Sequence, residues 1–222
     1  INDYLLDFSA VHPLDVANRP RTKEIRSAIK AYRKNLSAHA EYQLESAVGF
    51  SDVLSISPLF GLGASGNELN QVIEDLFLQV QEKLVICTPY FNFPRTLRSK
   101  LARLLEQGKR VEIIVGDKVA NDFYIPPEQP FKMAGALPYL YESNLRRFCE
   151  KFDAYIKNGH LTVRLWKDGD NTYHLKGIWV DNQYILLTGN NLNPRAWRLD
   201  AENGLLIHDP KQELLPQVEQ EL

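Results

Sequence analysis

The sequence predicts an α/β fold in which helices flank a mixed β-sheet. Apolar runs at 83–88 and 111–115 have the length of buried strands and are too short for helices. An amphipathic stretch at 95–107 separates them, which predicts a right-handed βαβ unit with parallel strands. A pattern of strand, turn and returning strand at 174–188 adds a second part to the sheet.

The first 52 residues are expected to form a helical and linker segment. The end of a helix is predicted at 1–11, followed by a proline-containing loop. A second helix is predicted at 22–36, where apolar residues recur at intervals of four, three and four: Ile25, Ile29, Tyr32 and Leu36. Its other face is basic. Attraction to anionic phospholipid, at about 1 kcal/mol per basic residue, and an ordinary solvated face both explain this pattern.

Residues 53–208 are expected to form the folded domain. A strand at 53–59 leads into a glycine-rich turn at 60–66, and Asn67 then caps a helix. The core stripe of that helix is Leu69, Val72, Ile73, Leu76 and Val80. The βαβ unit follows, and Gly108 ends its helix.

The second half of the domain begins with a loop at 124–141 that is long for a compact fold, which favours a functional role. Its apolar side chains, Phe131, Met133 and Leu137, have the character needed to enter lipid. A helix at 143–156 and a strand at 161–166 precede the strand pair. A helical turn at 193–198 and a strand at 204–207 follow it, and the tail at 209–222 is expected to be helical.

The pattern of His174, Lys176 and Asp181, with Asn191 ten residues later, indicates phosphate chemistry. On a strand, His174 and Lys176 would share one face, about 7 Å apart. Histidine attacks phosphorus or moves a proton, and lysine neutralises phosphoryl oxygens. An amide donor to a developing oxyanion is worth about 2.7–4 kcal/mol. The HxK pair alone is common by chance, but the whole pattern on a strand, turn and strand is much rarer.

This stretch resembles the signature motif of the phospholipase D superfamily, in which HxKxxxxD is followed by Gly-Ser and Asn. Here Thr188-Gly189 replaces Gly-Ser, which moves the hydroxyl by one position. The segments 88–94, 116–126, 164–181 and 188–204 are similar to the bacterial phosphatidylserine synthases of that superfamily, and the similarity covers nearly the whole chain.

The resemblance implies transfer of a phosphatidyl group from CDP-diacylglycerol to L-serine, with release of CMP, through a phosphatidyl-histidine and without a metal or other cofactor. Such enzymes have two pseudo-twofold halves, each with one HxKxxxxD motif. The described pattern occurs once in this chain, so the first motif is expected upstream of Ile1 and the chain is expected to hold one half of the site.

The resemblance also implies the site residues. Catalytic roles fall on His174, Lys176, Asn191, Asp181 and Glu202. His174 is expected to act as general acid and base, with the upstream histidine as nucleophile and Glu202 orienting it. The position of Asp181 also fits structural work at the turn.

Substrate contacts are expected where loops follow the parallel strands, because ligands bind at the carboxyl ends of strands in open α/β sheets. Tyr90, Lys118 and Asn121 lie in such loops, and Asn193 lies beyond the motif. For Tyr90, covering the sheet edge is an equally good interpretation.

Composition limits the partners. The net charge of −2 argues against a nuclease and against a required nucleic acid. Cys87 and Cys149 have the character of core thiols of a reducing cytoplasm. We expect cytoplasmic localisation with peripheral attachment to anionic phospholipid at the inner face of the cell membrane. A homo-oligomer, another phospholipase D-type enzyme such as cardiolipin synthase, and a membrane-binding module without activity stay open.

Overall fold

The computed structural model describes residues 23–24, 27–28, 30–31 and 52–222. The chain divides into two compact units, 1–46 and 47–222. The six described residues within the helix expected at 22–36 are helical. The rest of that helix and the helix end expected at 1–11 lie outside the described residues.

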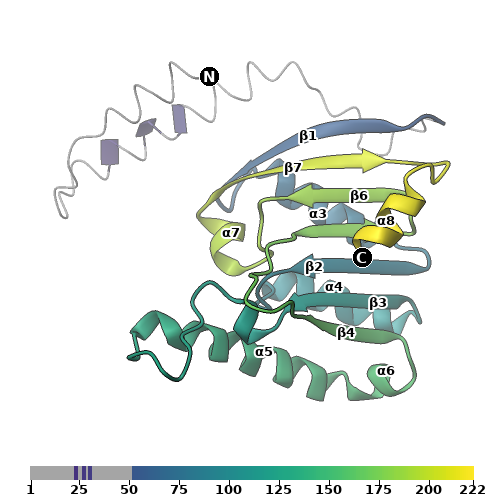
Figure 1. Cartoon of the computed structure of the whole chain (residues 1–222). Helices are drawn as coiled ribbons and strands as arrows, with labels where there is room; N and C mark the ends of the chain where they lie inside the picture. Colours follow the sequence, from purple (N-terminus) through teal and green to yellow (C-terminus); the bar gives the residue numbers. More distant parts are fainter. Residues whose placement is uncertain (1–22, 25–26, 29, 32–51) are drawn as a thin grey trace. The chain divides into compact units, whose positions relative to one another are not determined.

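A seven-stranded mixed sheet forms the centre of the second unit (Figure 1), so the fold class predicted from the sequence is confirmed. Its strand order is β1-β7-β6-β5-β2-β3-β4. The parallel strands are β2 (Lys83–Thr88), β3 (Arg110–Gly116) and β4 (Leu161–Trp166). The strands that pair antiparallel, with one another and with β2, are β1 (Ser55–Leu62), β5 (Gly177–Val180), β6 (Tyr184–Thr188) and β7 (Ala201–His208).

Helices cover both faces of the sheet. In Figure 1, α3 (Glu68–Gln79) and α4 (Arg95–Glu106) lie behind the sheet and α8 (Leu215–Glu221) lies in front of it. Val218 of α8 packs in a cluster with Val85 and Trp179. The remaining helical segments are η1 (Lys118–Ala120), η2 (Met133–Ala136), α5 (Leu137–Lys151), α6 (Asp153–Lys157) and α7 (Pro194–Arg198). Because both faces are covered, β2 is buried along almost its whole length.

The sequence predicted α3 well. Asn67 is its N-cap, and the Asn67 side chain accepts a hydrogen bond from the Asn70 backbone N–H. The five predicted stripe residues are all buried. The βαβ unit is also confirmed, since β2 and β3 are parallel neighbours. Cys87 is a core thiol as expected, and burial raises its pKa to about 11.

Two boundaries differ from those predicted. Strand β1 continues through Gly61 to Leu62, so the glycine-rich turn is shorter than 60–66. A side chain at Gly61 would lie 2.2 Å from the Asn67 side-chain oxygen, so only glycine lets the strand pass this close to the α3 cap. The helix expected at 143–156 begins at Leu137, with Pro138 in its first turn, and is interrupted at Phe152.

The main correction concerns the motif itself, because the strand expected from His174 begins only at Gly177. The last residue pair between β2 and β5 is Cys87 and Gly177, and β2 ends at Thr88. Residues 174–176 therefore have no strand on the β2 side. The segment is anchored instead by the loop after β3, where the Tyr173 N–H donates to the Ala120 carbonyl. A strand geometry with both side chains on one face does not apply to His174 and Lys176.

Asp181 lies at the other end of β5, in the turn to β6. Its carboxylate accepts hydrogen bonds from the backbone N–H groups of Gln81, Glu82 and Lys83, at 2.6, 2.9 and 2.7 Å. Asp181 and Asn182 both have positive φ, which aspartate and asparagine tolerate better than most residues. The carboxylate thus ties the β5–β6 turn to the start of β2.

We expect Asp181→Asn to lower the free energy of unfolding by about 1–2 kcal/mol, because it weakens charge-assisted hydrogen bonds while keeping a residue that tolerates positive φ. Urea denaturation measures this change. Asp170→Asn, at an exposed position in the turn before the motif, is the matched control and should change stability by less than about 0.5 kcal/mol. Equal effects of the two substitutions would contradict the structural role of Asp181.

Candidate active site

His174 belongs to a chain of three polar side chains. The Tyr90 hydroxyl donates to Asp122 Oδ2 at 2.7 Å, and the His174 imidazole Nε2 lies 2.9 Å from Asp122 Oδ1. Because an ionised carboxylate only accepts hydrogen bonds, Nε2 carries the proton in this contact. The side chains of His174 and Asp122 are 52% and 40% exposed. A pair this open adds little to stability, about 0–1 kcal/mol, so its main effect is to orient the imidazole.

The charges around Asp122 favour its ionised form. Burial opposes ionisation of the Asp122 carboxyl, but the hydrogen bonds from Tyr90 and His174 and the positive charges of His174 and Lys176 outweigh it and lower the pKa. Burial and the adjacent Asp122 raise the pKa of the Tyr90 hydroxyl, which keeps it a donor at neutral pH. The chain from Tyr90 to His174 therefore holds a permanent acceptor beside the imidazole.

Lys176 contacts the backbone of His174, whereas the sequence predicted two side chains on one face of a strand. Its ammonium Nζ donates to the backbone carbonyl of His174 at 2.8 Å, and its own carbonyl accepts from the Thr188 N–H. Partial burial lowers the pKa of Lys176, while the negative charges of Glu202 and Asp122 raise it and offset part of that effect. The negative charges of both carboxylates thus act on the Lys176 ammonium.

Asn191 is held beside the same strand ends by its backbone. The Thr88 hydroxyl donates to the Asn191 carbonyl at 2.8 Å, and Thr88 follows Cys87, the last β2 residue paired with β5. The buried Asn190 amide accepts from the Leu192 N–H and contacts Asn70 of α3, which fixes the turn. The side-chain oxygen of Asn191 is buried and, among the described residues, has no hydrogen-bond partner. This unpaired atom is an acceptor, so only a hydrogen-bond donor could pair with it.

Glu202 lies in β7, whereas the sequence placed it just before the strand. Burial, followed by repulsion from Asp200, raises its pKa. A Cβ at Gly189 would lie 2.9 Å from Glu202 Oε2, so the β6–α7 turn passes close to this carboxylate. Glu202 in β7 and Lys176 in the segment before β5 thus lie on either side of the end of β6.

The residues predicted to contact substrate fall into two groups. Tyr90, Lys118 and Asn121 line one cavity of about 440 Å³ between the strand ends and α5. Lys118 is not a free cation there, since its ammonium pairs with Glu142 at 3.0 Å. The Asn121 side chain accepts from the Phe123 N–H. Asn193 lies elsewhere and caps α7, accepting from the N–H groups of Arg195 and Ala196.

Asp181 is the motif residue that the fold does not bring to His174. Asp181 directly follows the last residue of β5, whereas His174 lies before the first residue of that strand. The Asp181 carboxylate already accepts hydrogen bonds from backbone N–H groups at the start of β2. Among the described residues, His, Cys, Asp and Glu side chains form no group of three or more that could hold a metal ion.

Sequence reasoning did not identify the partner of His174. Asp122 directly follows Asn121 in the loop after β3, 52 positions before His174. The available signal was its place at the carboxyl end of a parallel strand. No spacing rule predicts that this carboxylate, rather than Asn121 or Lys118, meets the imidazole. The roles of Asn70, Asn190 and Thr88 in holding the Asn191 turn were also missed.

Comparison with known proteins shows the family to which the chain belongs. A family model described as cardiolipin synthase, PLD-like domain, matches residues 73–222. The chain belongs to this PLD-like family. Over its whole length, the chain is 82% identical to the CDP-diacylglycerol–serine O-phosphatidyltransferase of Haemophilus influenzae and 54% identical to that of Escherichia coli.

A crystal structure of phosphatidylserine synthase from Haemophilus influenzae matches the PLD-like chain with a TM-score of 0.84 and 82% identity, over 100% of this chain and 49% of that one. The chain likewise covers 49% of each of the two curated relatives, and so spans about half their length. None of the helices in its described residues has the length and apolar character needed to cross a membrane.

We expect Glu202→Gln to lower the pKa of Lys176 in the PLD-like domain further, because it removes a negative charge that raises this pKa and leaves the desolvation that lowers it. The Lys176 ammonium should then lose its proton at a lower pH than in the wild type. An NMR titration of lysine side chains labelled with ¹³C measures this. Glu213→Gln, at an exposed position near α8, should leave the titration unchanged, and identical curves for wild type and Glu202→Gln would contradict the arrangement.

Proposed function

We propose that this chain supplies one half of an active site that transfers a phosphatidyl group from CDP-diacylglycerol to L-serine, giving phosphatidylserine and CMP. The observation that carries the proposal is 82% identity over the whole chain to an enzyme of that name. The imidazole of His174, oriented by Asp122, and the adjacent Lys176 support it, because these groups suit phosphoryl transfer.

The proposed reaction has two steps. A histidine from outside this chain's motif attacks the phosphorus of CDP-diacylglycerol, and the bond to CMP breaks as His174 gives its proton to the leaving phosphate oxygen. A phosphatidyl-histidine remains. The serine hydroxyl then attacks phosphorus, His174 takes the hydroxyl proton, and the phosphorus–nitrogen bond breaks to release the first histidine. Asp122 holds the imidazole of His174 in position through both steps.

In this scheme Lys176 and Asn191 stabilise the phosphoryl oxygens. The ammonium supplies positive charge, and the side-chain NH₂ group of Asn191 is the donor that the scheme assigns to a phosphoryl oxygen. Glu202 orients the histidine of the other half, and Asp181 contributes through the turn that it holds. Fixed protein donors provide the charge stabilisation, so the scheme uses no metal or other cofactor.

The cavity of about 440 Å³ is the proposed place for part of the substrate, because Tyr90 lines it and also bonds to the partner of His174. Its lining combines polar groups, such as Asn121, with apolar ones, such as Leu145 and Leu165. We assign Tyr90, Lys118 and Asn121 to substrate contact through this cavity. Asn193, which caps α7, contributes through the position of the turn that follows Asn191.

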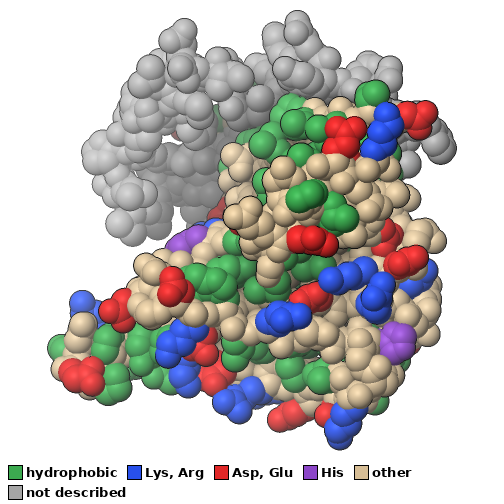
Figure 2. Space-filling view, turned by 45° about the vertical axis from the view of Figure 1, so that its right-hand side comes forward, with side chains coloured by type: hydrophobic (Ala, Val, Ile, Leu, Met, Phe, Trp, Pro, Cys, Tyr) green, Lys and Arg blue, Asp and Glu red, His purple; other side chains and the backbone are tan. Residues whose placement is uncertain are grey.

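A lipid substrate requires contact with a membrane, and the loop before α5 fits that role. Phe131 and Met133 are 72% and 90% exposed, although both are large and apolar. We propose a protein attached peripherally to anionic phospholipid at the inner, cytoplasmic face of the cell membrane, with a homo-oligomer still open. Figure 2 shows basic and acidic side chains interspersed on the face it draws, which does not favour nucleic acid as a partner.

The second candidate is a different phosphatidyl transfer or hydrolysis at the same site, as in cardiolipin synthase or phospholipase D. The observation in its favour is the description of the matching family model. A membrane-binding module without activity is the third. Incubation of the full-length protein with CDP-diacylglycerol and labelled serine tests the first proposal, since labelled phosphatidylserine forms only under it. Turnover of CDP-diacylglycerol without labelled phosphatidylserine indicates the second, and no turnover indicates the third.

We expect His174→Ala to reduce serine incorporation at least about a hundredfold, because a positioned acid–base group is worth 10²–10⁴ in rate. The unfolding curve should stay close to that of the wild type, since the side chain is half exposed. His160→Ala is the matched control, because His160 precedes β4 at the opposite end of the parallel strands. More than about a hundredth of the activity left in His174→Ala would refute the role.

We expect Asp122→Asn to reduce kcat at least about tenfold with little change in stability, because it removes the charge that orients and stabilises the imidazole. Steady-state kinetics with varied CDP-diacylglycerol should show the loss in kcat rather than in KM. Asp117→Asn, which alters the cap of η1 in the same loop, is the control for a purely structural effect. A loss confined to KM would assign Asp122 to substrate binding instead.

A further inference from the structure

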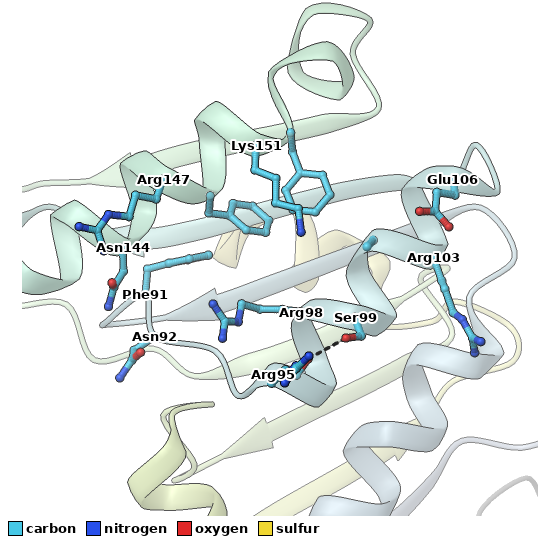
Figure 3. Close-up of a pocket in the computed structure, with 13 residues that line it drawn as sticks. Phe91, Asn92, Arg95, Arg98, Ser99, Arg103, Glu106, Asn144, Arg147 and Lys151 are labelled. Atoms are coloured by element: carbon cyan, nitrogen blue, oxygen red, sulfur yellow. Dashed lines mark hydrogen bonds between the residues drawn. The ribbon is translucent and has the colours of Figure 1, made fainter.

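A second cavity of about 880 Å³ lies between α4 and α5, and we call it the α4–α5 groove. Its lining is rich in cations: Arg95, Arg98, Arg103, Arg147 and Lys151. Figure 3 shows Arg98 and Lys151 extending into the groove from opposite sides. Three phenylalanines, Phe91, Phe148 and Phe152, line its inner part and are almost fully buried. The groove therefore presents charge over an apolar base.

The described residues do not neutralise the cations of the groove. Within the described residues none of the five forms an ion pair, and Glu106 is the one carboxylate among the lining residues. Basic residues of the same helices that face elsewhere do find partners, since Lys100 pairs with Glu74 and Arg146 with Glu142. The unpaired positive charge of α4 and α5 is therefore concentrated in the groove and is not spread evenly along the two helices.

Spacing along each helix brings these cations together. Arg95 and Arg98 are three residues apart on α4, and Arg147 and Lys151 are four apart on α5, so each pair shares one helix face. Like charges at these spacings destabilise a helix slightly. An anion bound in the groove between the two helices is expected to offset this repulsion and so to stabilise them.

We propose that the α4–α5 groove is a binding site for a phosphate-bearing ligand, separate from the site at His174. Guanidinium groups bind phosphate oxygens through paired hydrogen bonds, and Asn92, Ser99 and Asn144 add neutral polar groups along the walls. The phosphate belongs either to the headgroup of an anionic phospholipid or to a soluble phosphate compound, and both offer the same chemistry to the groove.

One end of the α4–α5 groove adjoins the loop that carries Tyr90, a residue of the candidate active site. Phe91 and Asn92, at one end of it, directly follow Tyr90, whose hydroxyl bonds to Asp122. A ligand held against Asn92 and Arg98 thus lies along the loop that carries Tyr90. This gives the groove a physical route to influence the orientation of His174, although its own binding does not depend on the proposed phosphatidyl transfer.

The test measures binding by the full chain in two arms. The first is co-sedimentation with vesicles of phosphatidylcholine containing phosphatidylglycerol, compared with phosphatidylcholine alone. The second is calorimetric titration with inorganic pyrophosphate. Arg98→Gln/Lys151→Gln removes two groove cations, and Lys167→Gln/Lys211→Gln removes two exposed cations elsewhere, so the net charge change is matched. A Lys176→Gln background eliminates phosphate binding at the proposed active site.

We expect the groove variant to bind at least one probe about 10- to 30-fold more weakly, and the control variant to bind like the wild type. Loss in the vesicle arm identifies a lipid headgroup, and loss in the pyrophosphate arm alone identifies a soluble phosphate. Equal binding by the two variants, or no binding of either probe by the wild type, would overturn the proposal. Arg98→Gln alone, at an exposed position, repeats the test if the double variant unfolds. Neither arm depends on turnover, so failure here leaves the proposed transfer reaction unaffected.

Discussion

The antiparallel pairing of β5 with β2 is the contact on which the rest of the structure depends. β2 also pairs in parallel with β3, so this one strand joins the βαβ part of the sheet to the hairpin part. The pairing ends at Cys87 and Gly177, where β2 turns away. The segment that carries His174 is thereby released from the sheet next to the carboxyl end of a parallel strand, which is where such folds bind ligands.

Release from the sheet changes what holds the motif. A residue in a strand has its backbone fixed by its neighbours, whereas residues 174–176 depend on contacts from loops. The Tyr173 N–H donates to Ala120, Lys176 reaches back to the His174 carbonyl, and Asp122 meets the imidazole. The geometry of the site is therefore set largely by the loop after β3. Substitutions in that loop should affect the chemistry without touching the motif.

Charge is distributed unevenly over this domain despite its small net value. The ionic groups near His174 compensate one another, since the negative charges of Asp122 and Glu202 offset the positive charge of Lys176. The cations of the α4–α5 groove lack such compensation among the described residues. Compensated charge suits a site that must accept and release a reacting group, and uncompensated charge suits a site that retains an anion. The two regions are joined by the short loop from Tyr90 to Asn92.

The sequence by itself determined the class of the fold and the identity of the motif residues. Local periodicity is enough for this, because an apolar run such as 84–87 can only be buried on both faces and Asn67 needs only its own helix to act as a cap. The turn at Asp181 was also placed correctly, since positive φ and a carboxylate at a strand end are local properties.

Only the tertiary structure decided where the motif leaves the sheet, that Asp122 is the partner of His174, and that Lys118 is occupied by Glu142. These depend on which strand ends first and on side chains 24 to 52 residues apart meeting in space. The α4–α5 groove likewise depends on the tertiary structure. Each helix shows an ordinary basic face in the sequence, and the packing of the two helices brings those faces together.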